Sequence, residues 1–234
     1  MNEIAILMAA GLGSRMRPLT DTVAKPLVKV NGVPLIETVI AALEKRGVSE
    51  IYVVTGYKAE QFAPLAEEHS GVRLVHNAEY ATKNNIGSIA VVADKMASSD
   101  CFVCEADLFL PKADVLCRGL SRSGYFGKMV AGFSDDWVFD IDASGRITRV
   151  GKGGTDCYNM VGVSYFRQAD AAKVAGAVVD AVKKPENANL FWDEVVDRLV
   201  KSGELDLVVH PVSQDEIVEC DTVEDLKELE ARLK

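Results

Sequence analysis

Long hydrophobic runs are missing from this 234-residue sequence. No segment approaches the roughly 18 apolar residues that a membrane-spanning helix needs, and Glu3 stands where a secretory signal would carry basic charge. Positive charge is also in deficit, because the formal net charge is −9. Nucleic acids and anionic membranes both attract a broad basic surface. We therefore expect a cytoplasmic protein whose partners include neither a membrane nor a nucleic acid.

Cysteine is sparse, and its spacing matches no standard metal site. Among the five cysteines, Cys101 and Cys104 form a CxxC, and no second CxxC or histidine pair follows at zinc-finger spacing. Both fall in a predicted strand, where positions three apart point to opposite faces. We expect buried, reduced core thiols.

Two standard phosphate-binding motifs are absent as well. The dinucleotide pattern GxGxxG needs a third glycine where Met16 stands, and the Gly-Lys-Ser/Thr of a P-loop occurs nowhere. Instead, the apolar run 4–10 is followed by GLGSRMRPLTDTVAKP at residues 11–26. This segment combines a glycine turn with several cations.

The residue types in this segment suit a polyphosphate. Gly11 and Gly13 lack a Cβ atom, so the backbone can turn tightly and bring its N–H groups against phosphate oxygens. Arg15, Arg17 and Lys25 add positive charge. Because cations clustered in an acidic chain need an anion to meet them, the segment indicates a nucleotide-using enzyme.

Strand-like and helix-like segments alternate along much of the sequence. This alternation predicts right-handed crossovers and a parallel sheet. We therefore expect an α/β fold: a Rossmann-like, three-layer, mostly parallel sheet with helices on both faces. The predicted strands are 3–10, 51–55, 72–76, 101–106, 206–210 and 217–219, and the predicted helices are 35–45, 58–68, 86–96, 169–183, 189–201 and 222–233.

The pattern changes at about residues 127–166. Four short β-type segments occur there, at 128–133, 137–141, 146–150 and 161–166, separated by turn residues such as DASG. We expect a small antiparallel insertion that binds substrate. A hydrophobic content of 48% suffices for one core, and we expect residues 1–234 to form a single domain.

Acidic residues at two predicted strand ends are candidate metal ligands. Asp107 follows the strand 101–106, and ligands gather at the carboxyl edge of an open α/β sheet. Glu219 ends the strand 217–219, and Asp221 follows it two residues later. Triphosphate chemistry needs a divalent cation, and Mg²⁺ prefers carboxylate oxygens. As alternatives, Asp107 could cap a turn and Asp221 could lie in the N-cap region of the last helix.

Residues 11–26 resemble the signature GxGxRxxPxTxxxPK of nucleotidyltransferases, which couple a nucleoside triphosphate to a phosphorylated small molecule and release pyrophosphate. One departure is local, since Ala24 precedes Lys25 where the family usually has proline, and Pro26 follows it. The resemblance sharpens to the bacterial CTP:phosphocholine cytidylyltransferases and covers nearly the whole chain. It is carried further by YATKNNIGS at 80–88, Ala106-Asp107, Asp136-Trp137, LFWD at 190–193 and IVECD at 217–221.

The resemblance implies a reaction and a set of roles. An acceptor oxygen attacks the α-phosphorus of CTP in line, and pyrophosphate leaves. Lys25 meets the charge that develops on the α-phosphate, and Arg15 with the glycine loop holds the pyrophosphate. Asp107 and Asp221 bind Mg²⁺, with Glu219 as a weaker candidate. The residues expected to bind the nucleotide are Ala9, Ala10, Gly11, Gly13, Asn84, Asn85 and Ser88; a helix N-cap is the alternative for the two asparagines.

The only two tryptophans suggest how an acceptor amine is recognised. Trp137 and Trp192 each adjoin an aspartate, Asp136 and Asp193. A quaternary ammonium has no N–H to donate, so it binds aromatic faces and nearby carboxylates. Phe191 and Tyr158 could add further walls. For any one of these aromatic residues, simple burial in the core is the alternative.

Several alternatives remain open from the sequence. The predicted acceptor is phosphocholine; 2-aminoethylphosphonate is the rival, because its primary ammonium would suit Asp136, Asp156 and Asp193. A sugar-phosphate or cofactor nucleotidyltransferase and a non-catalytic nucleotide-binding regulator are the further alternatives. The oligomeric state is open.

Overall fold

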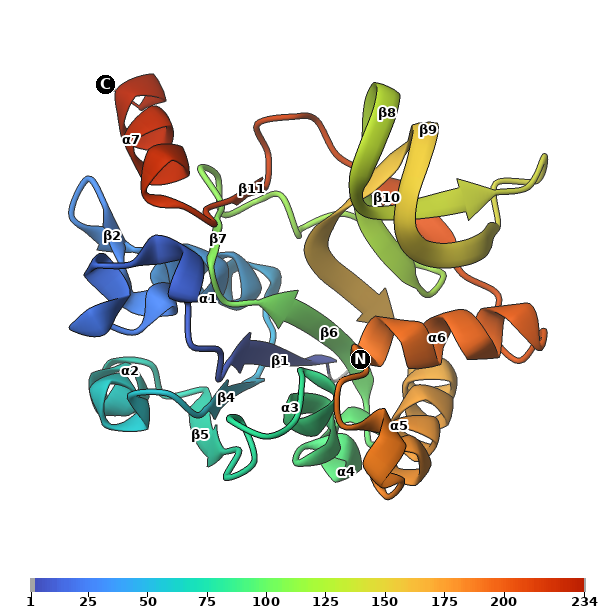
Figure 1. Cartoon of the computed structure of the whole chain (residues 1–234), viewed down its shortest axis with the longest axis horizontal. Coiled ribbons are helices and arrows are strands. Elements are labelled where there is room, and N and C mark those ends of the chain that lie inside the picture. Colours follow the sequence, from blue (N-terminus) through green and yellow to red (C-terminus); the bar gives the residue numbers. More distant parts are fainter. Residues whose placement is uncertain (1–2, 234) are drawn as a thin grey trace.

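The computed structural model describes residues 3–233, and a seven-stranded sheet lies at its centre (Figure 1). Four neighbouring strands of this sheet pair in parallel: β1 (Glu3–Ala9), β4 (Glu50–Thr55), β5 (Val72–His76) and β6 (Asp100–Glu105). β1 lies between β4 and β6, and its apolar sequence EIAILMA is covered on both faces, as expected for a central parallel strand. The strand order is β10-β8-β9-β6-β1-β4-β5.

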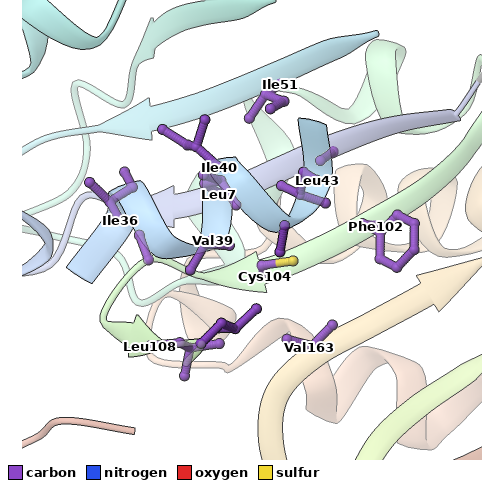
Figure 2. Close-up of a cluster of buried hydrophobic side chains, with 14 of the residues drawn as sticks. Leu7, Ile36, Val39, Ile40, Leu43, Ile51, Phe102, Cys104, Leu108 and Val163 are labelled. Atoms are coloured by element: carbon purple, nitrogen blue, oxygen red, sulfur yellow. The ribbon is translucent and has the colours of Figure 1, made fainter. Parts of the chain in front are cut away.

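Helices cover both faces of the sheet. On one face, α1 (Leu35–Arg46) and α2 (Ala63–Glu68) pack against side chains such as Leu7 and Cys104 (Figure 2). On the other face lie α3 (Ile86–Ala90), α4 (Ala93–Met96), α5 (Gln168–Val182) and α6 (Trp192–Lys201), against Ile6 and Cys101. The two cysteines of the CxxC are therefore buried in opposite layers, as predicted. The expected three-layer α/β fold is confirmed.

The antiparallel region differs from the sequence prediction. The prediction of four short strands is wrong. The structure has two long strands, β8 (Gly124–Ile141) and β9 (Ile147–Phe166), which pair with each other. Residues that read as turns make bulges instead, with register shifts between Val130 and Phe133 and between Ser134 and Trp137. A bulge bends a strand without ending it.

The same two strands link this region to the central sheet. β9 pairs antiparallel with β6, and β8 pairs with the edge strand β10 (Val208–Pro211). Their outer parts rise from the sheet as an arm (Figure 1). The predicted DASG turn is correct and joins the two strands, with Gly145 at a φ of 81°.

Smaller elements complete the fold. The predicted helix 86–96 is broken at Val92, whose backbone is not helical, so α3 and α4 are separate. The predicted helix 58–68 begins as a 3₁₀ turn, Ala59–Phe62, before α2. β2 (Lys29–Val30) and β3 (Val33–Pro34) form a hairpin beside α7 (Val223–Arg232). Within residues 3–233, no helix has the length and apolarity to cross a bilayer.

Candidate active site

A cavity of about 480 Å³ opens at the carboxyl ends of β1 and β6. Parallel strands end at the same edge of a sheet, so the segments that follow them meet there. The arm and the turn before α6 close the other side. The lining residues are Met8, Ala10, Gly11, Arg15, Asn77, Tyr80, Lys83, Asn84, Asn85, Ser88, Glu105, Asp107, Asp136, Trp137, Lys152, Phe191, Glu219 and Asp221.

Three carboxylates meet at one end of this cavity. A short antiparallel pair, β7 (Leu108–Phe109) and β11 (Val218–Glu219), brings the two acidic segments together. One oxygen each of Asp107, Glu219 and Asp221 lies within 4.8 Å of the others. Burial, with the neighbouring Asp107 and Asp221 carboxylates, raises the pKa of Glu219 to about 8. Asp107 Oδ1 is buried and has no hydrogen-bond partner among the described residues.

Lys25 joins two of these carboxylates. Its Nζ donates to Asp107 Oδ2 at 2.6 Å and to Asp221 Oδ1 at 2.5 Å. Burial alone would lower the pKa of Lys25, but the two carboxylates outweigh it and raise the pKa above its usual value. Lys25 is therefore a fixed cation at neutral pH. Arg15 pairs with the second oxygen of Asp221 at 2.8 Å and is itself mostly exposed.

The glycine loop is shaped to admit Lys25. Gly13 has a φ of 62°, and a Cβ atom there would lie 2.8 Å from Lys25 Cβ. The Thr20 hydroxyl donates to the Gly13 carbonyl at 2.8 Å, and Gln61 bonds the backbone of Ala24. Gly11 lines the cavity, and a Cβ atom there would have no neighbouring atom within 4 Å. A second hollow of about 390 Å³, which Ala9, Gly13 and Lys25 help to line, adjoins this loop.

The expected nucleotide residues line either this cavity or, for Ala9 and Gly13, the adjoining hollow, and the asparagines have additional partners. Ser88 is buried, lines the cavity and accepts a hydrogen bond from Asn77. Asn85 precedes α3 without capping it, and its side-chain oxygen accepts the N–H of Trp192 at 2.9 Å. Asn84 Nδ2 donates to the Asn189 carbonyl at 3.1 Å. Both asparagines thus contact the segment that leads into α6.

The opposite wall is aromatic and charged. Trp137 on β8 contacts Phe191 edge to face, with ring centroids 5.4 Å apart. Asp136 is exposed and accepts the N–H of Trp137 at 2.8 Å. Lys152 lies across from Trp137 on β9, and its Nζ is 5.9 Å from the Phe191 ring. This wall carries one carboxylate and one ammonium group.

Three residues expected at this wall lie elsewhere. The Trp192 side chain is buried in the core, with its ring centroid 6.0 Å from both Tyr125 and Phe166. Asp193 is also buried, accepts the Tyr125 hydroxyl at 3.0 Å, and its burial raises its pKa to about 7. Tyr158 packs against the same core cluster and does not line the cavity.

Some lining residues were not singled out from the sequence. Tyr80 and Lys83 belong to YATKNNIGS, so their neighbours Asn84 and Asn85 were the available signal. Glu105 ends β6, and burial with the nearby Asp107 carboxylate raises its pKa well above the usual value. The sequence pattern places Glu105 inside a buried strand. Its contact with the cavity depends on where β6 ends, which the pattern does not specify.

The sequence around this site matches a known protein family. The model of the MobA-like NTP transferase domain matches residues 5–141, which include the glycine loop, Lys25 and Asp107. This chain belongs to that family. The glycine loop at the end of β1 is therefore part of the region that this family shares. The chain is a nucleotidyltransferase.

Individual relatives resemble this transferase over nearly its whole length. A 2-aminoethylphosphonate cytidylyltransferase of Lancefieldella rimae is 50% identical over 222 residues, covering 95% of this chain and 89% of the relative. A choline-phosphate cytidylyltransferase of Streptococcus pneumoniae is 36% identical, with 98% of both chains covered. The solved structure of the S. pneumoniae CTP:phosphocholine cytidylyltransferase superposes with a TM-score of 0.91 at 34% identity and full coverage of both chains. The resemblance noted in the sequence is confirmed.

Proposed function

We propose that this transferase moves CMP from CTP to 2-aminoethylphosphonate and releases pyrophosphate. The relative with that activity in its name is 50% identical over 95% of the chain. The main structural support is the wall of the cavity formed by Asp136, Trp137, Lys152 and Phe191, which we call the acceptor wall. Trp137 and Phe191 lie beside the carboxylate of Asp136 there, whereas Trp192 lies in the core. A primary ammonium can donate N–H bonds to a carboxylate and needs fewer aromatic faces than a quaternary one.

Phosphocholine is the second candidate acceptor. The relative from S. pneumoniae named for it is 36% identical over 98% of the chain. The Trp137–Phe191 pair offers ring faces to a trimethylammonium group. Both acceptors end in an oxyanion that must reach the carboxylate end of the cavity. The chemistry at phosphorus is the same for either one.

The reaction we propose is in-line displacement at the α-phosphorus of CTP. A phosphonate oxygen forms the new P–O bond, and the bond to pyrophosphate breaks. Lys25 is fixed and cationic, so it can stabilise negative charge that develops on the α-phosphate. Arg15 and the backbone at Gly11 and Gly13 would hold the leaving pyrophosphate. Ala9, Ala10, Asn84 and Ser88 would surround the nucleoside.

The carboxylate cluster suits a magnesium ion. Asp107, Glu219 and Asp221 supply hard oxygen donors, and Asp107 Oδ1 has no partner among the described residues. Lys25 holds the pKa of Asp221 below its usual value although burial would raise it, so this carboxylate is ionised. We propose Asp107 and Asp221 as ligands, with Glu219 beside them. When bound there, the ion would offset charge on the reacting phosphates.

We further propose that residues 1–234 act as one domain. β8 and β9 start or finish in the central sheet and carry Trp137 and Lys152 on their outer parts. The substrate-binding region at 127–166 is thus built on strands of the main sheet.

A competition assay tests the proposal. The purified protein, CTP and Mg²⁺ are mixed with equimolar 2-aminoethylphosphonate and phosphocholine, and the products are separated. We expect pyrophosphate release and mainly CMP-aminoethylphosphonate. If CDP-choline is the main product, phosphocholine replaces 2-aminoethylphosphonate as the proposed acceptor. A sugar 1-phosphate as the only active acceptor, or no pyrophosphate at all, would overturn the function.

A further inference from the structure

Two adjacent asparagines join the nucleotide side of the cavity to the segment before α6. The N–H of Asn84 donates to the Ala188 carbonyl at 2.8 Å, and its side chain donates to the Asn189 carbonyl at 3.1 Å. Asn85 Oδ1 accepts the N–H of Trp192 at 2.9 Å, across 107 residues of the chain. These contacts connect two segments that are remote in the sequence.

The hydrogen bond to Asn85 satisfies a backbone N–H at the start of α6. The first N–H groups of a helix have no partner within the helix, and a side-chain oxygen at the N-cap normally satisfies one of them. Here the N-cap residue is Phe191, whose side chain cannot accept a hydrogen bond. Glu194 bonds the N–H of Phe191 at 2.9 Å, and Asn85 bonds that of Trp192. The helix is therefore capped partly from outside.

This external cap fixes the backbone next to the acceptor wall. Phe191 immediately precedes Trp192, and its ring contacts Trp137 5.4 Å away, centroid to centroid. The buried Trp192 indole anchors the same backbone from the core side. Phe191 is thus held between a core anchor and a hydrogen bond from the nucleotide side.

We propose that Asn85 is a positioning residue for the acceptor: its side-chain oxygen caps α6 and thereby holds Phe191 at the wall. This inference rests on the proposed function. It changes the role first expected for Asn85, because the side-chain oxygen is oriented by the Trp192 N–H, which takes one of its two lone pairs.

Steady-state kinetics with alanine and aspartate at this position test the role. At saturating CTP, Asn85→Ala should raise the KM for 2-aminoethylphosphonate about tenfold, the effect of one lost hydrogen bond, and should change the Kd for CTP far less. Asn85→Asp keeps the oxygen and should keep the acceptor KM near the wild-type value. The matched control is Asn187→Ala, which loses a bond to the Ala181 carbonyl in the same connection and should leave both constants unchanged.

A double-mutant cycle asks whether Asn85 acts through Phe191. If it does, Asn85→Ala combined with Phe191→Ala should raise the acceptor KM no further than Phe191→Ala alone. Additive effects would overturn the inference, and so would an equal loss of CTP affinity and acceptor affinity in Asn85→Ala. Should the alanine variant fail to fold, Asn85→Ser, which is too short to reach Trp192, takes its place.

Amide hydrogen exchange at Trp192 gives a readout that needs no turnover. Exchange of this N–H should be slow in the wild type and in Asn85→Asp, and faster in Asn85→Ala. Equal exchange in all three would overturn the cap. If the wild type turns over neither acceptor, the proposed function fails, while the exchange experiment still decides the positioning of the α6 backbone.

Discussion

The Lys25 ammonium lies 2.6 Å from Asp107 Oδ2, although 82 residues separate them in the chain. Its other partner, Asp221, is still more distant in sequence. The contact ties the loop after β1 to the segment after β6 at the point where phosphate charge would be met. A cation with two anionic partners is held in place before any substrate binds, which limits reorganisation during the reaction.

Replacing this lysine should separate catalysis from binding. In Lys25→Ala, kcat should fall by about 10² to 10³, because charge on the α-phosphate loses a preorganised donor. The Kd for CTP should change much less, since Arg15 and the loop backbone remain. Isothermal titration with CTP and a pyrophosphate-release assay measure the two quantities. Comparable losses in both would make Lys25 a ground-state binding residue.

The proposed magnesium requirement should depend on Asp107. We expect Asp107→Asn to raise the Mg²⁺ concentration needed for half-maximal rate at least about tenfold, because a charged ligand becomes a neutral one. A Mg²⁺ titration at fixed CTP measures this shift. Asp114→Asn, an exposed aspartate outside the cavity, serves as the control. Unchanged magnesium dependence in Asp107→Asn would remove this residue from the metal site.

Stability should fall as the pH rises, because of Asp193. Its pKa is raised by burial to about 7 in the folded protein, against about 4 in an unfolded chain. Between these two pKa values the folded state keeps a proton that the unfolded state has released. The contribution of Asp193 to the free energy of unfolding is therefore fully present below pH 4, and it is lost as the pH rises from 4 through 7. Asp193→Asn should gain stability relative to wild type by up to roughly 4 kcal/mol between pH 4 and 8.

Urea unfolding at a series of pH values measures this gain. Asp180→Asn is the control, since the exposed Asp180 carboxylate has its pKa lowered by Lys183 rather than raised. A difference between wild type and Asp193→Asn that stays constant with pH would mean that the pKa of Asp193 is the same in the folded and unfolded states.

The two tryptophans should respond to mutation in different ways. Trp137→Ala should raise the acceptor KM with little effect on thermal stability, because the side chain is only partly buried at the wall. Trp192→Ala should cost about 3 to 5 kcal/mol of unfolding free energy, as a large core truncation does. Denaturant curves and acceptor titrations on the two variants make the comparison. A normal acceptor KM in Trp137→Ala would leave the wall without a binding role.

Asp136 should discriminate between the candidate acceptors. Asp136→Asn should reduce kcat/KM for 2-aminoethylphosphonate more than for phosphocholine, since only a primary ammonium donates N–H bonds to the carboxylate. The ratio of the two kcat/KM values, measured in wild type and variant, reports the difference. An equal reduction would limit Asp136 to a general electrostatic effect.

The strand ends and the glycine loop were predictable because their chemistry is local in sequence. Asp107 follows an apolar run, and parallel strands bring such ends to a common edge. The arm was misread because bulges and turns use the same residues, as at Ser134 and Gly153. Trp192 was misplaced for a different reason: it and Phe191 are adjacent, and only the start of α6 decides which of them faces the core.

The continuity of β8 and β9 with the central sheet has a consequence for the choice of acceptor. In the proposed site, the triphosphate end is built from loops after β1 and β6, whereas Trp137 and Lys152 of the acceptor wall lie on the far halves of two strands whose near halves pair within the central sheet. We therefore expect substitutions on those far halves to change the preferred acceptor while leaving the proposed chemistry at phosphorus intact.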